Sequence, residues 1–314
     1  MVQGVHPGRL LAGATMLSLT SLIPVGVAQA APGDSAAGGR APHVCAPLVD
    51  FDSGDFSAPT VIDNEYLPMV PGTRLTYEGV VSGGGAQEAH QVVFTVTDLV
   101  KDVAGVRTRV IYDVDQTAGE VTEAELAFFA QDDAGNVWNL GEYPEEYEGG
   151  TFTGAPNVWI HGLEGATGGI HMPADAERLV NGPEYLQGEA PEIDFLDCAR
   201  VAAIGGKVTV PAGHFTDVLT TYERSPLESL RAIQIKEHAP GVGIVRISAR
   251  NDPEGETLEL VSIEQLGPQE LGEVDRAAFQ LDRHGHRVSE VYSQTPDVQA
   301  EDVHGHPGGR HQES

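Results

Sequence analysis

Five histidines lie in the last thirty-one residues and could bind a transition-metal ion. They are His284, His286, His304, His306 and His311. Two of the pairs have the spacing His-x-His, which on an extended chain places both imidazoles on one side. Neutral imidazole binds Zn²⁺ and Cu²⁺, and Asp282, Glu290, Glu301 and Asp302 could complete a site. The sequence predicts Zn²⁺ or Cu²⁺ binding by a flexible tail. The alternative is a polar tail that binds no metal.

Three acidic residues near position 50 could bind calcium. Asp50, Asp52 and Asp55 offer the hard oxygen ligands that Ca²⁺ prefers. Their spacing is not that of an EF-hand, because Gly54 falls at the fifth position from Asp50 and Val61 at the twelfth. A solvated acidic loop is the alternative to a calcium site.

A third group of residues, between positions 138 and 171, could line a ligand pocket. The predicted ligand-binding residues are Trp138, Glu142, Tyr143, Trp159, His161 and His171. Aromatic side chains with a few polar groups are typical of small-molecule pockets. A histidine of this group beside Glu142 or Glu145 could also act as a general acid–base pair in a hydrolase. The alternative is that the aromatic residues are core and the glutamates are solvated.

Sequence motifs of common enzymes are missing. The chain contains no GxSxG, HExxH, GxxxxGK[ST] or CxxC motif. A scattered catalytic triad remains possible. The sequence therefore favours a protein that is not an enzyme, and it identifies no catalytic residue.

The N-terminus predicts export from a bacterial cell. Residues 1–30 have one charged side chain, Arg9, followed by a broken apolar run and Ala28-Gln29-Ala30, which predicts a signal peptide cleaved after Ala30. The small, Gly- and Pro-rich composition of residues 31–45 predicts a disordered lead-in. An oxidising compartment favours a disulfide between the two cysteines, Cys45 and Cys198.

The charge of the chain excludes some partners. There are 47 acidic and 18 basic residues, for a net charge of −29. Such a surface repels phosphate backbones and anionic lipids, so we expect no nucleic-acid partner. No segment after the signal is long and apolar enough for a transmembrane helix, so we expect no membrane insertion.

Alternating hydrophobicity predicts a single antiparallel β domain over residues 46–266. Apolar residues recur with period two in segments such as 90–99 and 106–114, and turn residues separate them. We expect a curved sheet, either a half-barrel or a sandwich, with few short helices. Residues 141–196 break the rhythm and predict a long irregular insertion. Residues 267–314 predict a flexible, acidic, His-rich tail.

Several motifs resemble a known group of proteins. They include Asn64 to Thr73 (NEYLPMVPGT), Val210 to Phe215 (VPAGHF) and Ala239 to Gly243 (APGVG). In these the chain resembles a widespread family of uncharacterised secreted bacterial β-rich proteins, broadly similar to periplasmic lipoprotein-carrier half-barrels. The resemblance implies a curved sheet and no particular reaction.

Together these patterns predict a secreted, non-enzymatic binding protein. We expect an apolar or amphipathic small ligand on the concave face of the sheet, because the strands are apolar on one side only. A secreted hydrolase that uses the histidines and glutamates of 141–172 is the alternative. The sequence predicts no oligomeric state.

Overall fold

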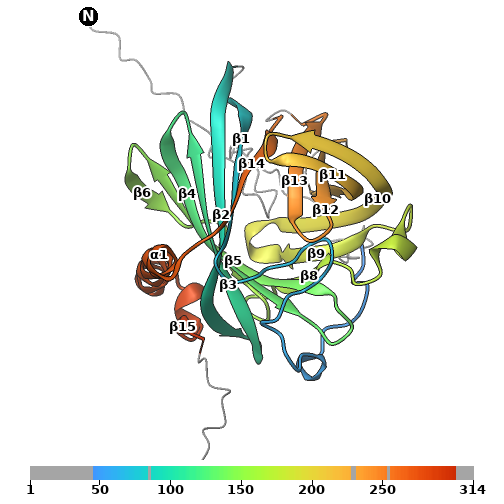
Figure 1. The fold of residues 1–314 in the computed structure, drawn as a ribbon. Coiled ribbons are helices and arrows are strands. Elements are labelled where there is room, and N and C mark those ends of the chain that lie inside the picture. The colour runs from blue at the N-terminus through green and yellow to red at the C-terminus, as the bar shows by residue number, and fades with distance from the viewer. Residues whose placement is uncertain (1–44, 84–85, 228–230, 253–254, 302–314) are drawn as a thin grey trace, which may run out of the picture.

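The chain forms a closed antiparallel β-barrel with one long helix on its outer side (Figure 1). The computed structural model describes residues 45–83, 86–227, 231–252 and 255–301. The predicted signal peptide, its cleavage site, nearly all of the lead-in, and His304, His306 and His311 therefore lie outside the described residues.

Twelve strands make up the barrel wall. In chain order they are β1 (Thr73–Gly83), β2 (Ala86–Val103), β3 (Val106–Thr117), β4 (Glu120–Gln131), β5 (Val137–Glu148), β8 (Thr167–Met172), β9 (Tyr185–Ala190), β10 (Phe195–Val210), β11 (Gly213–Arg224), β12 (Ile233–Ala239), β13 (Gly243–Arg250) and β14 (Thr257–Gln265). The other elements are η1 (Ser53–Asp55), β6 (Thr151–Gly154), β7 (Trp159–Ile160), η2 (Ala176–Leu179), η3 (Pro191–Ile193), α1 (Pro268–Val288), η4 (Tyr292–Gln294) and β15 (Gln299–Ala300).

The sheet closes at β1, which pairs with β14 on one edge and with β2 on the other. Neighbouring strands run antiparallel around the whole wall. The prediction of a mainly antiparallel β fold is confirmed. The sequence left open a half-barrel or a sandwich, whereas the observed sheet is a closed barrel. Closure leaves β1 without a free edge, so its backbone groups are paired on both sides.

The prediction of a long irregular insertion over 141–196 is wrong. This region completes β5 and contains β6, β7, β8 and β9. β7 can pair with β5 because position 141 is glycine: it has φ +149°, and a Cβ there would lie 2.8 Å from the carbonyl oxygen of Trp159. Close approach of two backbones requires glycine at this position, and glycine interrupts the alternation of apolar and polar residues from which strands are predicted.

The two faces of the wall have different surroundings. Inward side chains of nearly all the barrel strands form one apolar cluster in the barrel interior, here called the lumen core; it includes Val92, Ile111 and Ala127. Outward side chains of β4 such as Leu126 and Phe128 belong to a second cluster, which packs against α1. Alternate residues on one strand therefore point into the lumen or toward the helix.

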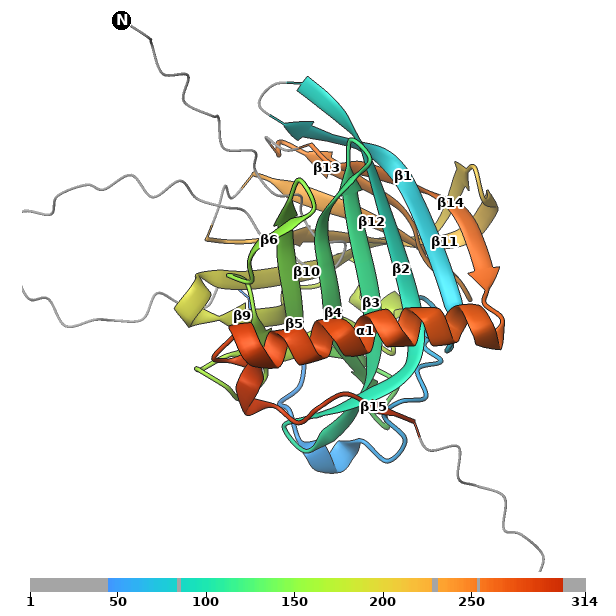
Figure 2. The same ribbon diagram turned by 90° about the vertical axis from the view of Figure 1, so that its left-hand side faces the viewer.

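The prediction of a flexible tail from residue 267 is wrong for residues 268–301. α1 crosses the outer side of β5, β4, β3 and β2 (Figure 2). Ala278 and Leu281 are buried against the barrel. Pro268 at the first helical position is favourable, since a helix leaves that backbone N–H unbonded in any case. The chain then returns along the barrel as β15, which pairs with β2.

The predicted disulfide is present. Cys45 and Cys198 are bonded, with their Cα atoms 6.0 Å apart. The bond attaches the first described residue to β10 in the wall and fits an oxidising compartment outside the cytoplasm. Within the described part of the chain, no helix has both the length and the apolar character needed to cross a membrane.

Candidate functional site

The lumen contains two facing pairs of carboxylates. Asp113 and Asp115 of β3 lie directly opposite Glu125 and Glu123 of β4. We call these four residues the acid rungs. Each is at most 2% exposed. They alternate with outward residues and share the inward face with Ile111 and Ala127 of the lumen core. Like charges placed directly across a sheet repel one another, so this arrangement is unfavourable when the carboxylates are ionised.

Most oxygens of the acid rungs lack a hydrogen-bond partner. Both carboxylate oxygens of Asp113 and both of Glu125 are buried without one, as are one oxygen of Asp115 and one of Glu123. In the described structure, His90 is the only basic side chain within 4 Å of these four groups, at 3.8 Å from Asp115. Buried charges are otherwise paired or bound to a metal in most proteins.

Burial dominates the protonation of the acid rungs. It raises the pKa of Asp113 to about 7, against a smaller opposite effect of the Val114 backbone N–H. Burial also raises the pKa values of Asp115, Glu123 and Glu125 well above their usual range, and neighbouring carboxylates add to the rise. Ionising all four together without a cation would therefore be very unfavourable.

One further carboxylate extends the cluster. Glu256 precedes β14 and is 1% exposed. Its Oε1 lies 3.2 Å from Nε2 of His90, and its Oε2 accepts a hydrogen bond from Gln234 of β12 at 3.0 Å. His90 and Glu256 thus connect the acid rungs to Gln234 of β12, on another part of the barrel wall.

A second polar group in the lumen is balanced in charge. The Lys236 ammonium lies 2.6 Å from the Glu223 carboxylate, and both side chains are at most 5% exposed. Burial lowers the pKa of His171 to about 4 and that of His238 to about 3. These histidines are therefore neutral at pH 7. The contrast shows that the fold supplies a cation for Glu223 and supplies none of comparable strength for the acid rungs.

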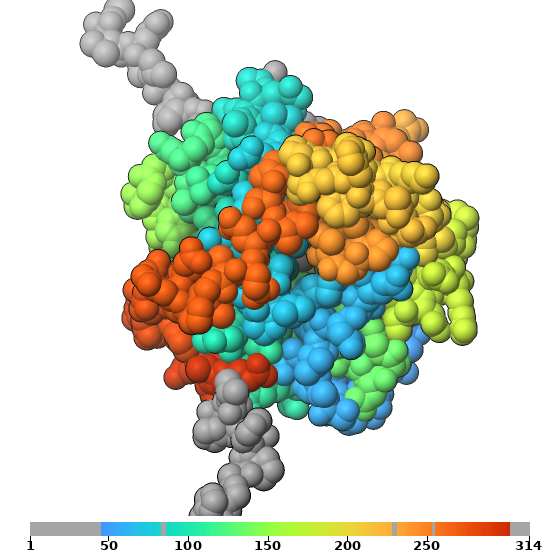
Figure 3. Space-filling view, in the orientation of Figure 1, coloured from blue at the N-terminus to red at the C-terminus, as the bar shows by residue number. Residues whose placement is uncertain are grey.

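The lumen core also contains a small apolar cavity. Leu67, Tyr77, Phe94 and Ile244 are among its lining residues, and its volume of about 10 Å³ holds roughly one water molecule. Leu67 comes from the segment 45–72, which packs beside the strands of the C-terminal half of the barrel (Figure 3). A ligand larger than water therefore needs lumen side chains to move.

The structure brings together two of the predicted ligand-binding residues. The Glu142 carboxylate accepts a hydrogen bond from Nε1 of Trp159 at 3.0 Å and another from Asn139 at 2.6 Å. Glu142 lies opposite Ala127 of the lumen core, and its charge contributes to the raised pKa of Glu125. It thus borders the acid rungs.

The other four predicted residues lie elsewhere. Trp138 and Tyr143 belong to the cluster beneath α1. The His161 ring lies 4.2 Å from that of Phe51, and its Nδ1 accepts a hydrogen bond from the backbone of Gly168. His171 is in the lumen, beside Phe129. The central residues therefore serve three different regions and do not form one cleft.

The predicted metal ligands lie in separate parts of the structure. The carboxylates of Asp50, Asp52 and Asp55 do not come within 4.8 Å of one another as a group, and Asp52 instead accepts a hydrogen bond from the Gly54 backbone. Calcium binding there stays a prediction. His284 is on α1, where its Nδ1 lies 2.6 Å from the buried carboxylate of Glu145.

The acid rungs were not predicted, although the sequence contains their signal. Two aspartates alternate with other residues just before the Ala118-Gly119 turn, and two glutamates do so just after it. A hairpin register centred on this turn places the four on one face. Strand faces with charged residues usually lie toward solvent, so this pattern does not by itself indicate an inward acidic face.

Comparisons with known proteins give only distant structural likenesses. No protein-family model matches the chain, and no curated protein matches it. A Bacteroides fragilis protein with a YmcC-like fold is similar over 64% of this chain and 99% of its own, with 15% identity and a TM-score of 0.38. A β-barrel-like protein of unknown function from Brucella abortus covers 64% of this chain and 100% of its own, with 13% identity and a TM-score of 0.34. At TM-scores below 0.5, neither likeness defines the fold or function of this protein.

The class of protein follows instead from its own geometry. It is a closed antiparallel β-barrel, braced by one disulfide, whose interior contains a cluster of buried carboxylates.

Proposed function

We propose that this is an exported, non-enzymatic binding protein that holds a small amphipathic cation inside its barrel. The ligand's positive group would lie against the acid rungs, and its apolar part would lie in the lumen core. The observation that carries this proposal is the set of buried, unpartnered oxygens on Asp113 and Glu125.

The energetics favour a cationic ligand. An unpaired buried carboxylate costs several kcal/mol when ionised, and a protonated one without a partner still loses hydrogen bonds to water. An organic ammonium group would provide both positive charge and N–H donors to the four carboxylates. Charge-assisted hydrogen bonds of this kind are about twice as strong as neutral ones.

The apolar part of the ligand has a place beside the charged group. Phe94 of β2 lies directly opposite Asp113 in the sheet and also lines the apolar cavity. This cavity holds only about one water molecule, so binding would displace side chains such as Leu67. We therefore expect a ligand with a short apolar group, because this group has to enlarge the existing cavity by displacing side chains.

The hydrolase alternative has weaker support. Glu142 is occupied by Asn139 and Trp159, and Glu145 is in contact with His284. His161 and His171 have pKa values lowered by burial. Nothing in the described residues gives either histidine a carboxylate partner within ion-pair distance, so we favour binding without catalysis.

Calorimetry tests the proposal. A series of short alkylammonium ions is titrated into the protein, with the corresponding alcohols as neutral analogues. We expect the ammonium ions to bind and the alcohols not to bind. Because the acid rungs are partly protonated near pH 7, binding should release protons, and the measured enthalpy should depend on the ionisation enthalpy of the buffer.

Variants separate lumen binding from attraction to the acidic surface. Asp113→Asn with Glu125→Gln should abolish binding and proton release, whereas Glu120→Gln, an exposed change on the same β4 strand, should leave both intact. Equal binding by all three proteins would assign the signal to surface charge and overturn the proposal.

A further inference from the structure

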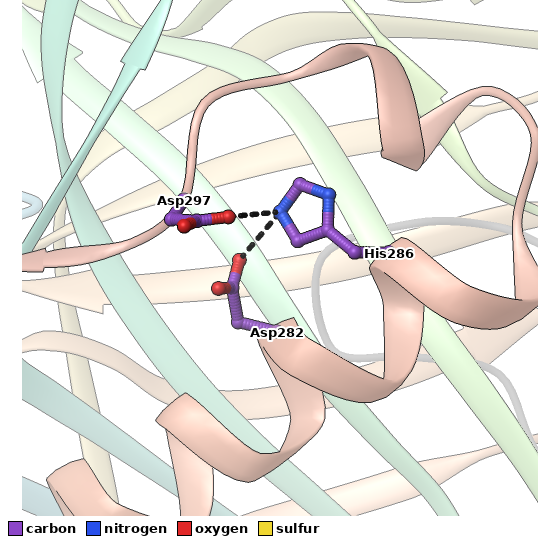
Figure 4. Close-up of side chains that lie close together, drawn as sticks. All are labelled: Asp282, His286 and Asp297. Atoms are coloured by element: carbon purple, nitrogen blue, oxygen red, sulfur yellow. Dashed lines mark ion pairs between the residues drawn. The ribbon is translucent and has the colours of Figure 1, made fainter.

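A second cluster of ligand-type side chains lies outside the barrel, where α1 meets the returning chain (Figure 4). Nε2 of His286 is 3.5 Å from Oδ1 of Asp282 and 3.3 Å from Oδ1 of Asp297. The three donor atoms all lie within 4.8 Å of one another. In the described part of the chain, no other group of three such residues meets this condition.

The spacing of these atoms suits a tetrahedral metal ion. Zn²⁺ binds imidazole nitrogen and carboxylate oxygen at about 2.0–2.2 Å, so two ligands at the tetrahedral angle are roughly 3.3–3.5 Å apart. The two separations from Nε2 of His286, 3.5 Å to Asp282 and 3.3 Å to Asp297, fall in this range. Asp282 and His286 are four residues apart on α1, which places them on the same face of the helix.

Asp282 is held rigidly for such a role. It is 1% exposed. Its Oδ1 accepts hydrogen bonds from Tyr292 at 2.8 Å and from Lys101 at 3.2 Å, and its Oδ2 accepts one from the Val298 backbone at 3.3 Å. Contacts of this kind orient the ligands in metal sites. Lys101 is fixed in turn by the Pro296 carbonyl and by the ring of Tyr292.

The local charges leave room for a divalent ion. Lys101 balances Asp282, but the only basic side chain within ion-pair distance of Asp297, among the described residues, is His286. When the imidazole is neutral, as it must be to bind a metal, the Asp297 carboxylate has no cation. Asp297 is also 85% exposed, so it can adjust to an ion and leave one coordination position to water.

We propose that Asp282, His286 and Asp297 bind one Zn²⁺ ion that fastens α1 to the returning chain. The site is independent of the lumen and of its ligand. A protonated His286 between two carboxylates is the competing explanation of the same distances, because an imidazolium also attracts both. The two explanations make different predictions for Zn²⁺. If the three side chains form a metal site, the chain binds the ion and removal of one side chain weakens binding; if His286 is an imidazolium, the chain has no such site.

The test uses the full-length chain with His304, His306 and His311 all changed to Asn, so that the C-terminal histidines do not contribute. Calorimetry with Zn²⁺ at pH 7.5 should then show one site per chain. Asp297→Asn should weaken binding at least tenfold, and this exposed position carries little risk of unfolding. His286→Asn should weaken it further, while His214→Asn, a change at an exposed histidine on β11, should have no effect.

Co²⁺ provides a second measurement. A tetrahedral nitrogen and oxygen site gives an intense visible absorption band, which should appear in the parent chain and disappear with Asp297→Asn. Zn²⁺ affinity that is unchanged by both Asp297→Asn and His286→Asn would overturn the proposal. So would the absence of a site in the parent chain, which would leave the imidazolium as the explanation.

Discussion

At the scale of single residues, the central feature is the difference between two polar groups in one lumen. Glu223 has a buried ammonium at 2.6 Å. Burial alone would raise the pKa of Glu223, but attraction and hydrogen bonding by Lys236, together with His171 and His238, outweigh burial and lower this pKa to about 2. Asp113 is equally buried, has no such partner, and has a pKa raised to about 7. The same environment therefore stabilises one carboxylate as an anion and another as an acid, according to the cation beside it.

The raised pKa of Asp113 makes stability depend on pH in a definite direction. Between about 3.8 and about 7 the folded protein holds a proton that the unfolded chain has lost. The contribution of this group to stability is therefore full at low pH and falls as the pH rises through this window. We expect Asp113→Asn with Glu125→Gln to stabilise the ligand-free protein by a few kcal/mol at pH 8, because each pKa unit corresponds to about 1.4 kcal/mol.

The same double variant should gain much less at pH 5. Urea unfolding at both pH values measures the difference, and Glu120→Gln serves as the control without a pH-dependent effect. A gain of equal size at pH 5 and pH 8 would show that the acid rungs do not titrate between the two.

At the buried ion pair, removal of a charged side chain should lower stability, in contrast to the gain expected at the acid rungs. Lys236→Met leaves the Glu223 carboxylate buried without its cation and should cost about 3–5 kcal/mol. Adding Glu223→Leu should recover most of that loss, since two apolar residues can replace a buried pair at little cost. Denaturation at pH 7 of the single and double variants checks this; no recovery in the double variant would contradict it.

At the scale of elements, α1 packs on the barrel through a close contact at a glycine as well as through apolar side chains. Gly285 lies where the helix meets the aromatic rings of Tyr143 and Tyr292, and a Cβ there would be 2.7 Å from both. Gly272, on the same helix, has only Arg276 nearby, at 4.0 Å. The two glycines thus separate packing from helix propensity.

Replacing each glycine by alanine should give opposite changes in stability. Gly285→Ala should destabilise by about 1–3 kcal/mol through overpacking, whereas Gly272→Ala should stabilise by about 0.5–1 kcal/mol through helix propensity. Chemical denaturation of the two variants measures both. A stabilising Gly285→Ala would show that α1 does not pack on β5 as described.

The sequence predicted the strands better than this helix, for physical reasons. Strands such as β2 and β3 alternate regularly, and their turns have clear chemistry. In α1, few residues are strongly apolar, and glycine, aspartate and histidine occupy positions that pack on the barrel, such as Asp282 and Gly285. The pattern consequently resembled a polar tail. The acid rungs were missed for a related reason, since nothing local shows that a charged strand face points inward.

At the scale of the whole molecule, closure and the disulfide act together. The barrel closes between β1 and β2 early in the wall and β14 near its end. The disulfide attaches the start of the described chain to β10, with a separation of 153 residues. Long-range connections of this kind restrict the unfolded chain most strongly.

Removing the disulfide should therefore lower stability without changing the fold. In the chain-entropy model a loop of this length contributes about 5 kcal/mol. We expect Cys45→Ala with Cys198→Ala to melt at a clearly lower temperature and to keep the circular dichroism of a β-protein. Thermal melting checks this, and an unchanged melting temperature would contradict the role assigned to the bond.

The most direct test of cation binding in the lumen is the mass of the folded protein as it leaves the cell. We would recover the exported wild-type protein and its Asp113→Asn, Glu125→Gln variant without denaturation and weigh both by native mass spectrometry. We expect a small bound molecule on the wild type that dissociates as a cation and is missing from the variant. Two bare polypeptides, with no cationic compound binding to the wild type afterwards, would contradict it.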